Sequence, residues 1–128
     1  MITEDYVSFE TAKLLKEKGF NEKTYRCYNL CTEEHELSDM DDIALNNWEL
    51  DNDGVTAPTL QMAMKWLRDE KGIAIIPIID SILDHEKFLW DSKIAVAKTN
   101  ETFSQGWVYE NPESGYDRAI RYCLENLI

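Results

Sequence analysis

Acidic residues with the spacing of calcium ligands lie in the middle of the chain. Glu49, Asp51 and Asp53 match the first, third and fifth ligand positions of an EF-hand loop. Gly54 follows them, where that loop has its turn glycine. The last position should carry a glutamate that binds the ion through both oxygens, but Leu60 stands there and no helical pattern precedes Glu49. We therefore interpret this segment as a solvated turn and expect no calcium site.

Cys27, Cys31 and His35 form a second group of residue types that bind metals. In a helix their spacing would place all three on one face, where thiolates and an imidazole could hold zinc. The local pattern is that of a strand followed by a loop, and a fourth soft ligand would have to be Cys123 or His85. The chain has three cysteines, an odd number, so we expect reduced thiols, no disulfide framework and no metal.

Catalytic motifs are absent from the sequence. It contains no nucleophile elbow, phosphate-binding loop, dinucleotide fingerprint or zinc-protease motif. Trp66, Trp90, Trp107 and Tyr109 could stack on a ligand only if they were exposed together, and their spacing favours packing in or beside a core. We therefore predict that the protein is not an enzyme, and we expect no catalytic residues and no cofactor. With 25 carboxylates in the chain, an enzyme that uses an acid/base carboxylate pair is the minor alternative, although no particular pair stands out.

The charge of the chain restricts its partners. There are 25 acidic residues against 13 Lys and Arg, a net charge of −12. Nine of the acidic residues fall between Glu33 and Asp53, where there is no Lys or Arg. This excess argues against direct binding to nucleic acid, which requires a basic surface. It leaves open an acidic inhibitor that imitates nucleic acid and binds a basic protein.

The first residues of the chain and its hydropathy predict the cellular location. Residues 1–5 are acidic where a secretory leader would be basic, and no apolar run reaches the length of a membrane span. We expect a cytoplasmic protein without membrane contact.

End signals and periodicity predict the secondary structure. Ser8 can cap a helix that Gly19 would end, and Pro58 suits the first turn of another helix that stops before Gly72. Pro77 restricts its strand to a sheet edge or a bulge. The predicted elements are helix 9–18, strand 24–30, helix 57–72, strands 73–80, 87–98 and 104–110, and a final helix capped by Ser114.

This order of elements predicts an α+β fold. The most economical arrangement is an antiparallel sheet of about three to four strands with helices packed on one face. Residues 1–128 are expected to form a single domain with an acidic variable loop at about 33–56. Whether Trp48–Leu50 adds a strand is left open, and we expect that a short linker could replace residues 36–51 without unfolding the protein.

Three blocks of the chain resemble small phage and prophage proteins of gut Bacteroidetes. The blocks are VSFETAKLLKEKGF, APTLQMAMKWLRDEKGI and YDRAIRYCLENLI, and the resemblance extends over most of the chain. The second carries Trp66, Leu67 and Arg68, and the third carries Tyr116 and Ala119. That group of proteins has no established activity, so the resemblance implies kinship and a variable middle segment but no site residues.

The expected function is that of a small accessory protein of phage or prophage origin that binds another protein. The alternative is an acidic inhibitor or nucleic-acid mimic that targets a basic host protein. The sequence leaves the identity of the protein partner and the oligomeric state open.

Overall fold

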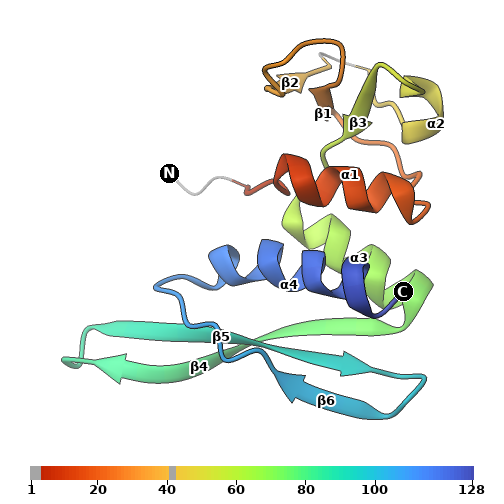
Figure 1. The fold of residues 1–128 in the computed structure, drawn as a ribbon. Helices are drawn as coiled ribbons and strands as arrows, with labels where there is room; N and C mark the ends of the chain where they lie inside the picture. The colour runs from red at the N-terminus through yellow and green to blue at the C-terminus, as the bar shows by residue number, and fades with distance from the viewer. Residues whose placement is uncertain (1–3, 41–42) are drawn as a thin grey trace. The chain divides into compact units, whose positions relative to one another are not determined.

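The computed structural model describes residues 4–40 and 43–128 (Figure 1). It divides the chain into two compact units, Met1–Met62 (unit 1) and Ala63–Ile128 (unit 2). The described residues form four helices and two antiparallel three-stranded sheets, which confirms the predicted α+β class. The strands are divided between two sheets, whereas the sequence predicted one.

Unit 1 contains a small sheet with strand order β2-β1-β3. Both neighbours run antiparallel to the central strand, and both helices that lie wholly within this unit pack against β3. Its elements are α1 (Phe9–Glu17), β1 (Arg26–Asn29), β2 (Leu37–Asp39), α2 (Asn47–Leu50) and β3 (Gly54–Thr56).

The first helix begins and ends as its sequence signals predict. The Ser8 side chain accepts a hydrogen bond from the Thr11 amide at 3.3 Å, which satisfies an otherwise free donor of the first turn. Gly19 has a φ of 96°, a left-handed conformation that glycine adopts without strain. Ala12 and Leu15 are completely buried, so the apolar stripe forms the packed face of α1.

The expected loop at 33–56 is wrong, because regular structure occupies much of this range. It contains β2, α2 and β3, and in addition Leu45 pairs with Thr24 through two backbone hydrogen bonds. Trp48–Leu50 belongs to α2 and therefore adds no strand. Asp41 and Asp42, two members of the acidic run, lie outside the described residues.

A buried asparagine explains why this acidic segment is ordered. The Asn47 amide nitrogen donates to the Phe20 carbonyl at 2.7 Å, and its oxygen accepts from the Thr56 amide at 2.8 Å. Lys16 of α1 donates to the carbonyls of Asp51 and Gly54 in the turn that leads into β3. Removing residues 36–51 would delete these contacts, so the structure predicts a loss of stability where the sequence led us to expect that a short linker could replace the segment.

Unit 2 is an antiparallel meander with one helix packed on it. Its strands are β4 (Ile73–Leu83), β5 (Lys87–Val96) and β6 (Glu101–Ser104), in the order β4-β5-β6. The last helix, α4 (Pro112–Asn126), packs on β4 and β5 and lies along one face of this sheet (Figure 1). The meander and the edge position of Pro77 agree with the predictions.

Two predicted boundaries in unit 2 are wrong. The third strand lies at Glu101–Ser104, and most of the predicted strand 104–110 is irregular. Asp91 is the physical reason, because its carboxylate accepts from the amides of Ser92 and Gly106 and so holds a turn in which Gly106 has a φ of 74°. In addition, Asn111 rather than Ser114 caps α4, accepting from the Ser114 amide at 2.9 Å.

The remaining helix, α3 (Leu60–Lys71), spans the boundary between the two units. Thr59 accepts a hydrogen bond from the Met62 amide, so Pro58 lies just before the helix and not in its first turn. Ala63 and Leu67 are completely buried, as the periodicity predicted. The corresponding stripe of α4 is also buried and consists of Tyr116, Ala119, Ile120, Cys123 and Leu124.

Candidate protein-binding surface

The β4–β5 hairpin extends past the end of α4. Its strands pair from Ile73 with Val96 to Leu83 with Lys87, and Figure 1 shows the hairpin running beyond the helix. Gly115, in the first turns of α4, lies against Ser92, where a Cβ would be 3.1 Å from the Ser92 hydroxyl. The part of the hairpin beyond Ser92 therefore continues a sheet face that α4 covers only in part.

A β-bulge determines which side chains share this face. The register shifts between Ile79 and Ser81, so Ile79 lies opposite Trp90 and Ile82 lies opposite Phe88. Cross-strand partners share a face, as do residues two apart in one strand, so these four side chains lie on the same side of the hairpin. In a regular strand, Ile79 and Ile82 would lie on opposite faces.

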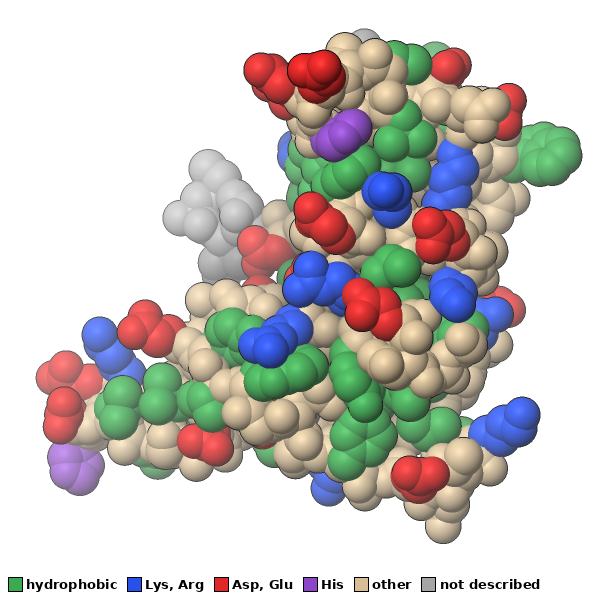
Figure 2. All heavy atoms as spheres, viewed as in Figure 1, with side chains coloured by type: hydrophobic (Ala, Val, Ile, Leu, Met, Phe, Trp, Pro, Cys, Tyr) green, Lys and Arg blue, Asp and Glu red, His purple; other side chains and the backbone are tan. Residues whose placement is uncertain are grey.

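These four residues, Ile79, Ile82, Phe88 and Trp90, are called the hairpin patch below. Ile79 is 51% exposed, Ile82 is 62% exposed and Phe88 is 46% exposed. Phe88 and Trp90 make an edge-to-face contact with ring centroids 5.9 Å apart, which restrains both rings. Figure 2 shows hydrophobic side chains gathered along this hairpin.

Acidic side chains surround the turn of the hairpin. Asp80, Asp84 and Glu86 are exposed, and Lys87 is the only basic residue between Gly72 and Ser92. Asp84 and His85 both have a positive φ, which forms the tight reversal between the strands. The hairpin patch thus has a predominantly negative rim, which favours a partner with basic residues around an apolar surface.

The outer edge of β4 is a poor site for adding another strand. Pro77 lacks a backbone donor, the bulge interrupts the regular ladder, and Asp80 adds a charge at that point. These three features disfavour backbone pairing along the edge. The hairpin is therefore better suited to contact a partner through the side chains of the hairpin patch than through backbone pairing at its edge.

The residues that resemble an EF-hand loop are used in other ways. Glu49 accepts from the Asn46 amide in a capping box of α2, and Asp51 ends that helix with a φ of 50°. Gly54 begins β3, and Leu60 begins α3. Within residues 4–40 and 43–128, no group of three or more His, Cys, Asp or Glu side chains could hold a metal ion.

The cysteines and histidines also have separate environments. Cys27 is half-buried in β1, whereas Cys31 is exposed and its thiol donates to Asp53 at 3.6 Å. His35 stacks on Phe9 with ring centroids 4.0 Å apart, and its Nδ1 donates to the Asn29 carbonyl at 2.9 Å. His85 lies in the hairpin turn. Burial raises the pKa of Cys123 to about 12.

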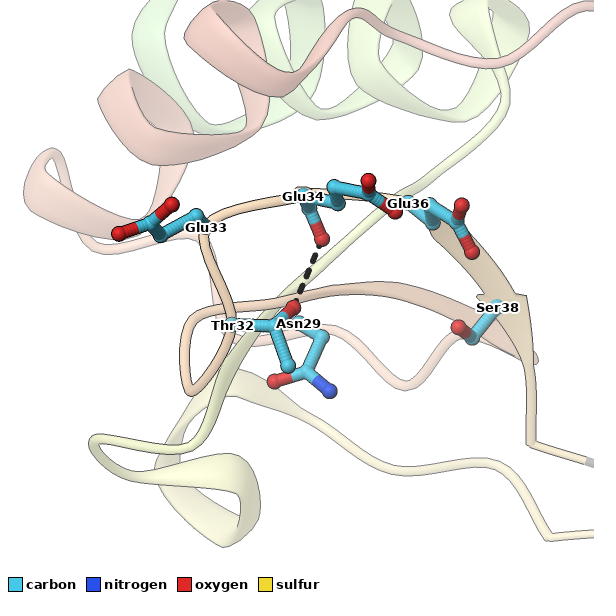
Figure 3. A pocket seen from close by; sticks show the side chains of 6 residues that line it. All are labelled: Asn29, Thr32, Glu33, Glu34, Glu36 and Ser38. Atoms are coloured by element: carbon cyan, nitrogen blue, oxygen red, sulfur yellow. Dashed lines mark hydrogen bonds between the residues drawn. The ribbon is translucent and has the colours of Figure 1, made fainter.

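An acidic hollow lies beside the β1–β2 connection (Figure 3). Its volume is about 470 Å³, and the Thr32 hydroxyl donates to the Glu34 carbonyl across it at 2.8 Å. The lining residues are Asn29, Thr32, Glu33, Glu34, Glu36 and Ser38. The three carboxylates would attract cations in general, but the hollow is open and offers no arrangement selective for one of them.

The aromatic residues singled out in the sequence do not act as one stacking surface. Trp66 is 8% exposed, as expected for a core residue. The Arg118 guanidinium lies 3.7 Å from the centre of the Trp107 ring and donates to the Tyr109 hydroxyl at 3.2 Å. Because Arg118 covers Trp107, that ring is already engaged in a cation–π contact.

Sequence reasoning missed the hairpin patch. The apolar run at 73–79 predicts a strand that ends at Asp80. One signal was available, because apolar residues continue as Ile82, Leu83 and Phe88 on both sides of a polar turn. Such a continuation predicts a longer hairpin, although it does not reveal the bulge.

Comparisons with known proteins give no relative of this chain. No family model, no curated protein sequence and no solved structure matches it. Among the helices of the described residues, none combines the length and the apolar character required to cross a membrane.

Proposed function

We propose that this protein acts by binding another protein and that the hairpin patch is the contact surface. The observation that supports this proposal is the joint exposure of Ile79, Ile82 and Phe88 on one face. Contiguous apolar surface of this kind is typical of interaction sites, because burying it against a partner removes it from water. Trp90, the half-buried fourth member of the patch, supplies a large aromatic group of the kind that dominates binding energy at interfaces.

The partner we propose is a protein with an apolar groove bordered by lysine or arginine. The rim formed by Asp80, Asp84 and Glu86 would attract such a groove and orient the encounter. A second copy of this chain is a less suitable partner for the hairpin patch, because two-fold pairing would bring the acidic rims of both copies together. The role is that of an accessory protein without catalysis or cofactor, and phage kinship and a cytoplasmic location remain predictions.

Site-specific photocrosslinking tests the proposal. A photoreactive phenylalanine analogue replaces Ile82 in one variant and Ile43 of unit 1 in another, since both residues are 62% exposed. In cells that make the protein naturally, we expect a crosslinked partner from position 82 and none from position 43. A product with twice the mass of the chain would instead indicate self-association and would overturn the choice of partner.

Affinity measurements with the purified partner complete the test. Ile82→Asp should weaken binding by about tenfold or more, while Ile43→Asp should leave it unchanged. Both variants add one negative charge and remove the same side chain, so a difference between them reports the location of the contact. Equal effects of the two substitutions, or none, would contradict the proposal.

The alternative function, an acidic inhibitor of a nucleic-acid-binding protein, is favoured by one observation. Residues 1–62 contain 14 acidic and five basic residues, a net charge of −9, whereas residues 63–128 contain 11 acidic and eight basic residues, a net charge of −3. The excess is thus concentrated in unit 1. Displacement of this protein from its partner by duplex DNA would support the inhibitor over the accessory role.

A further inference from the structure

Trp48 is a large exposed aromatic residue of unit 1 that does not belong to the hairpin patch. It lies on α2, and 82% of its surface is exposed, the highest value among the large apolar residues described. Tryptophan is normally largely buried, and where it lies on a surface it is among the residues most enriched in binding hot spots.

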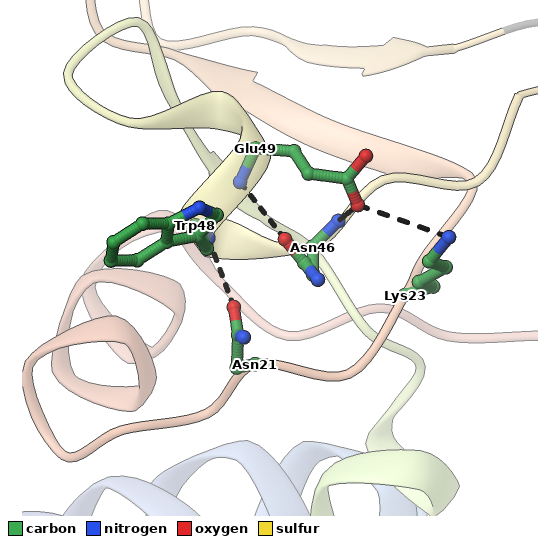
Figure 4. A network of polar contacts seen from close by, with 5 residues as sticks. All are labelled: Asn21, Lys23, Asn46, Trp48 and Glu49. Atoms are coloured by element: carbon green, nitrogen blue, oxygen red, sulfur yellow. Dashed lines mark hydrogen bonds and ion pairs between the residues drawn. The ribbon is translucent and has the colours of Figure 1, made fainter.

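The backbone that carries Trp48 is held firmly (Figure 4). Asn46 and Glu49 form a capping box, in which the Asn46 side chain accepts from the Glu49 amide at 2.9 Å. The Trp48 amide donates to the side chain of Asn21 at 2.9 Å. Between them, Asn47 is buried and anchors the helix through its two hydrogen bonds. The indole therefore projects from a preorganised platform, which lowers the entropic cost of binding.

The charge around this platform favours a cationic ligand. Unit 1 carries a net charge of −9, so it attracts positive groups over a distance comparable to the Debye length, roughly 8 Å at physiological ionic strength. Two lysines close to α2 already have partners, because Lys23 pairs with Glu49 at 4.0 Å and Lys16 donates to the carbonyls of Asp51 and Gly54. In Figure 4 the indole points away from Lys23 and Glu49, and its 82% exposure leaves most of the ring accessible to a ligand.

We infer that Trp48 binds an arginine side chain from a basic segment of a partner protein. The guanidinium would stack on the indole face, while the carboxylates of unit 1 attract the rest of the segment. Arginine fits better than lysine because its planar, weakly hydrated cation stacks on an aromatic ring. This site is separate from the hairpin patch and does not depend on the function proposed for that patch.

The test uses three synthetic peptides that differ only in one residue type: arginine, lysine or citrulline, each alternating with glycine and serine. Citrulline has the shape of arginine without its charge. Binding is followed through the indole N–H signals of the four tryptophans in an NMR spectrum. We expect the arginine peptide to shift one indole signal, the one that is missing in Trp48→Leu, with a weaker effect of the lysine peptide and none of the citrulline peptide.

Matched variants separate a specific contact from general attraction between charges. Trp48→Leu should lower the affinity for the arginine peptide severalfold, whereas Tyr25→Leu, which removes another exposed aromatic of unit 1 without a change of charge, should not. Unchanged binding by Trp48→Leu, equal binding of the citrulline peptide, or no binding at all would overturn the inference. Ile82→Asp should bind the arginine peptide normally, so failure of this inference and failure of the hairpin patch can be told apart.

Discussion

At the scale of single residues, Cys31 and Asp53 form a polar pair in unit 1. The Cys31 thiol donates to the Asp53 carboxylate at 3.6 Å. Desolvation, the negative charge of Asp53 and this hydrogen bond all raise the pKa of Cys31 above its ordinary value. Because the thiolate is the reactive form, a raised pKa slows alkylation at a given pH even though this cysteine is exposed.

Asp53→Asn should therefore speed the alkylation of Cys31. Removing the carboxylate charge lowers the thiol pKa toward its ordinary value and increases the thiolate fraction at mildly alkaline pH. Mass spectrometry after timed treatment with iodoacetamide measures the rate. Asp51→Asn is the matched control, because asparagine tolerates the positive φ at that position. Equal rates in the Asp53→Asn variant and the original protein would contradict this assignment.

Leu67 contributes to the stability of the protein through apolar packing alone. It is completely buried on α3, so Leu67→Ala should lower the free energy of unfolding by about 2–5 kcal/mol through lost transfer energy and a cavity. Denaturation by urea measures the change. Lys65→Ala, at an exposed position of the same helix, should have little effect. An unchanged midpoint for Leu67→Ala would show that the site repacks without loss.

At the scale of elements, the acidic segment and the β4–β5 hairpin determine the candidate surfaces. In the acidic segment, α2 has only four residues, far fewer than a helix needs to be stable alone. It forms because its caps and Asn47 attach it to the rest of unit 1. In the β4–β5 hairpin, one extra residue at the bulge brings Ile79 and Ile82 onto one face. Each element presents large apolar groups that the protein itself leaves exposed.

Asn47→Ala should destabilise the protein by about 2–4 kcal/mol. The substitution removes two buried hydrogen bonds, one to the Phe20 carbonyl and one from the Thr56 amide, and the loss of each costs about 1–3 kcal/mol. Thermal or urea unfolding provides the measurement. Asn52→Ala, an exposed position in the following turn, should stay within about 0.5 kcal/mol of the original. If both variants were equally stable, Asn47 would not be the anchor of α2.

At the scale of the whole molecule, the boundary between the two units falls inside a helix. Unit 1 ends at Met62 and unit 2 begins at Ala63, while α3 continues from Leu60 to Lys71. Boundaries between independent domains usually fall in exposed linkers with few contacts, and no such linker is found at this position. The expectation of a single domain therefore stays a prediction that unfolding can test.

We expect one cooperative unfolding transition for residues 1–128. The amides of Thr56 in unit 1 and Ile94 in unit 2 both belong to completely buried residues and can report on their units separately. A urea titration followed by NMR should give the same midpoint for both signals, as in two-state unfolding. Two distinct midpoints would show that the units unfold independently and would contradict the single domain.

The sequence by itself determined the features that depend on neighbours along the chain. The cap at Ser8, the stop at Gly19 and the apolar stripes of the helices are local patterns, and the acidic excess follows from composition. The α+β class could be predicted because these patterns give the type and order of most elements. The same local patterns predicted the bounds of β6 and the N-cap of α4 incorrectly.

Only the tertiary structure decided what the acidic segment and the hairpin become. Asn47 orders α2 by bonding to Phe20, 27 residues away, and no local pattern indicates such a partner. The bulge at Asp80 becomes visible only when β4 is paired with β5, since it is a mismatch between two strands. Exposure likewise depends on what the rest of the chain covers, so the structure alone distinguishes the exposed Trp48 from the buried Trp66.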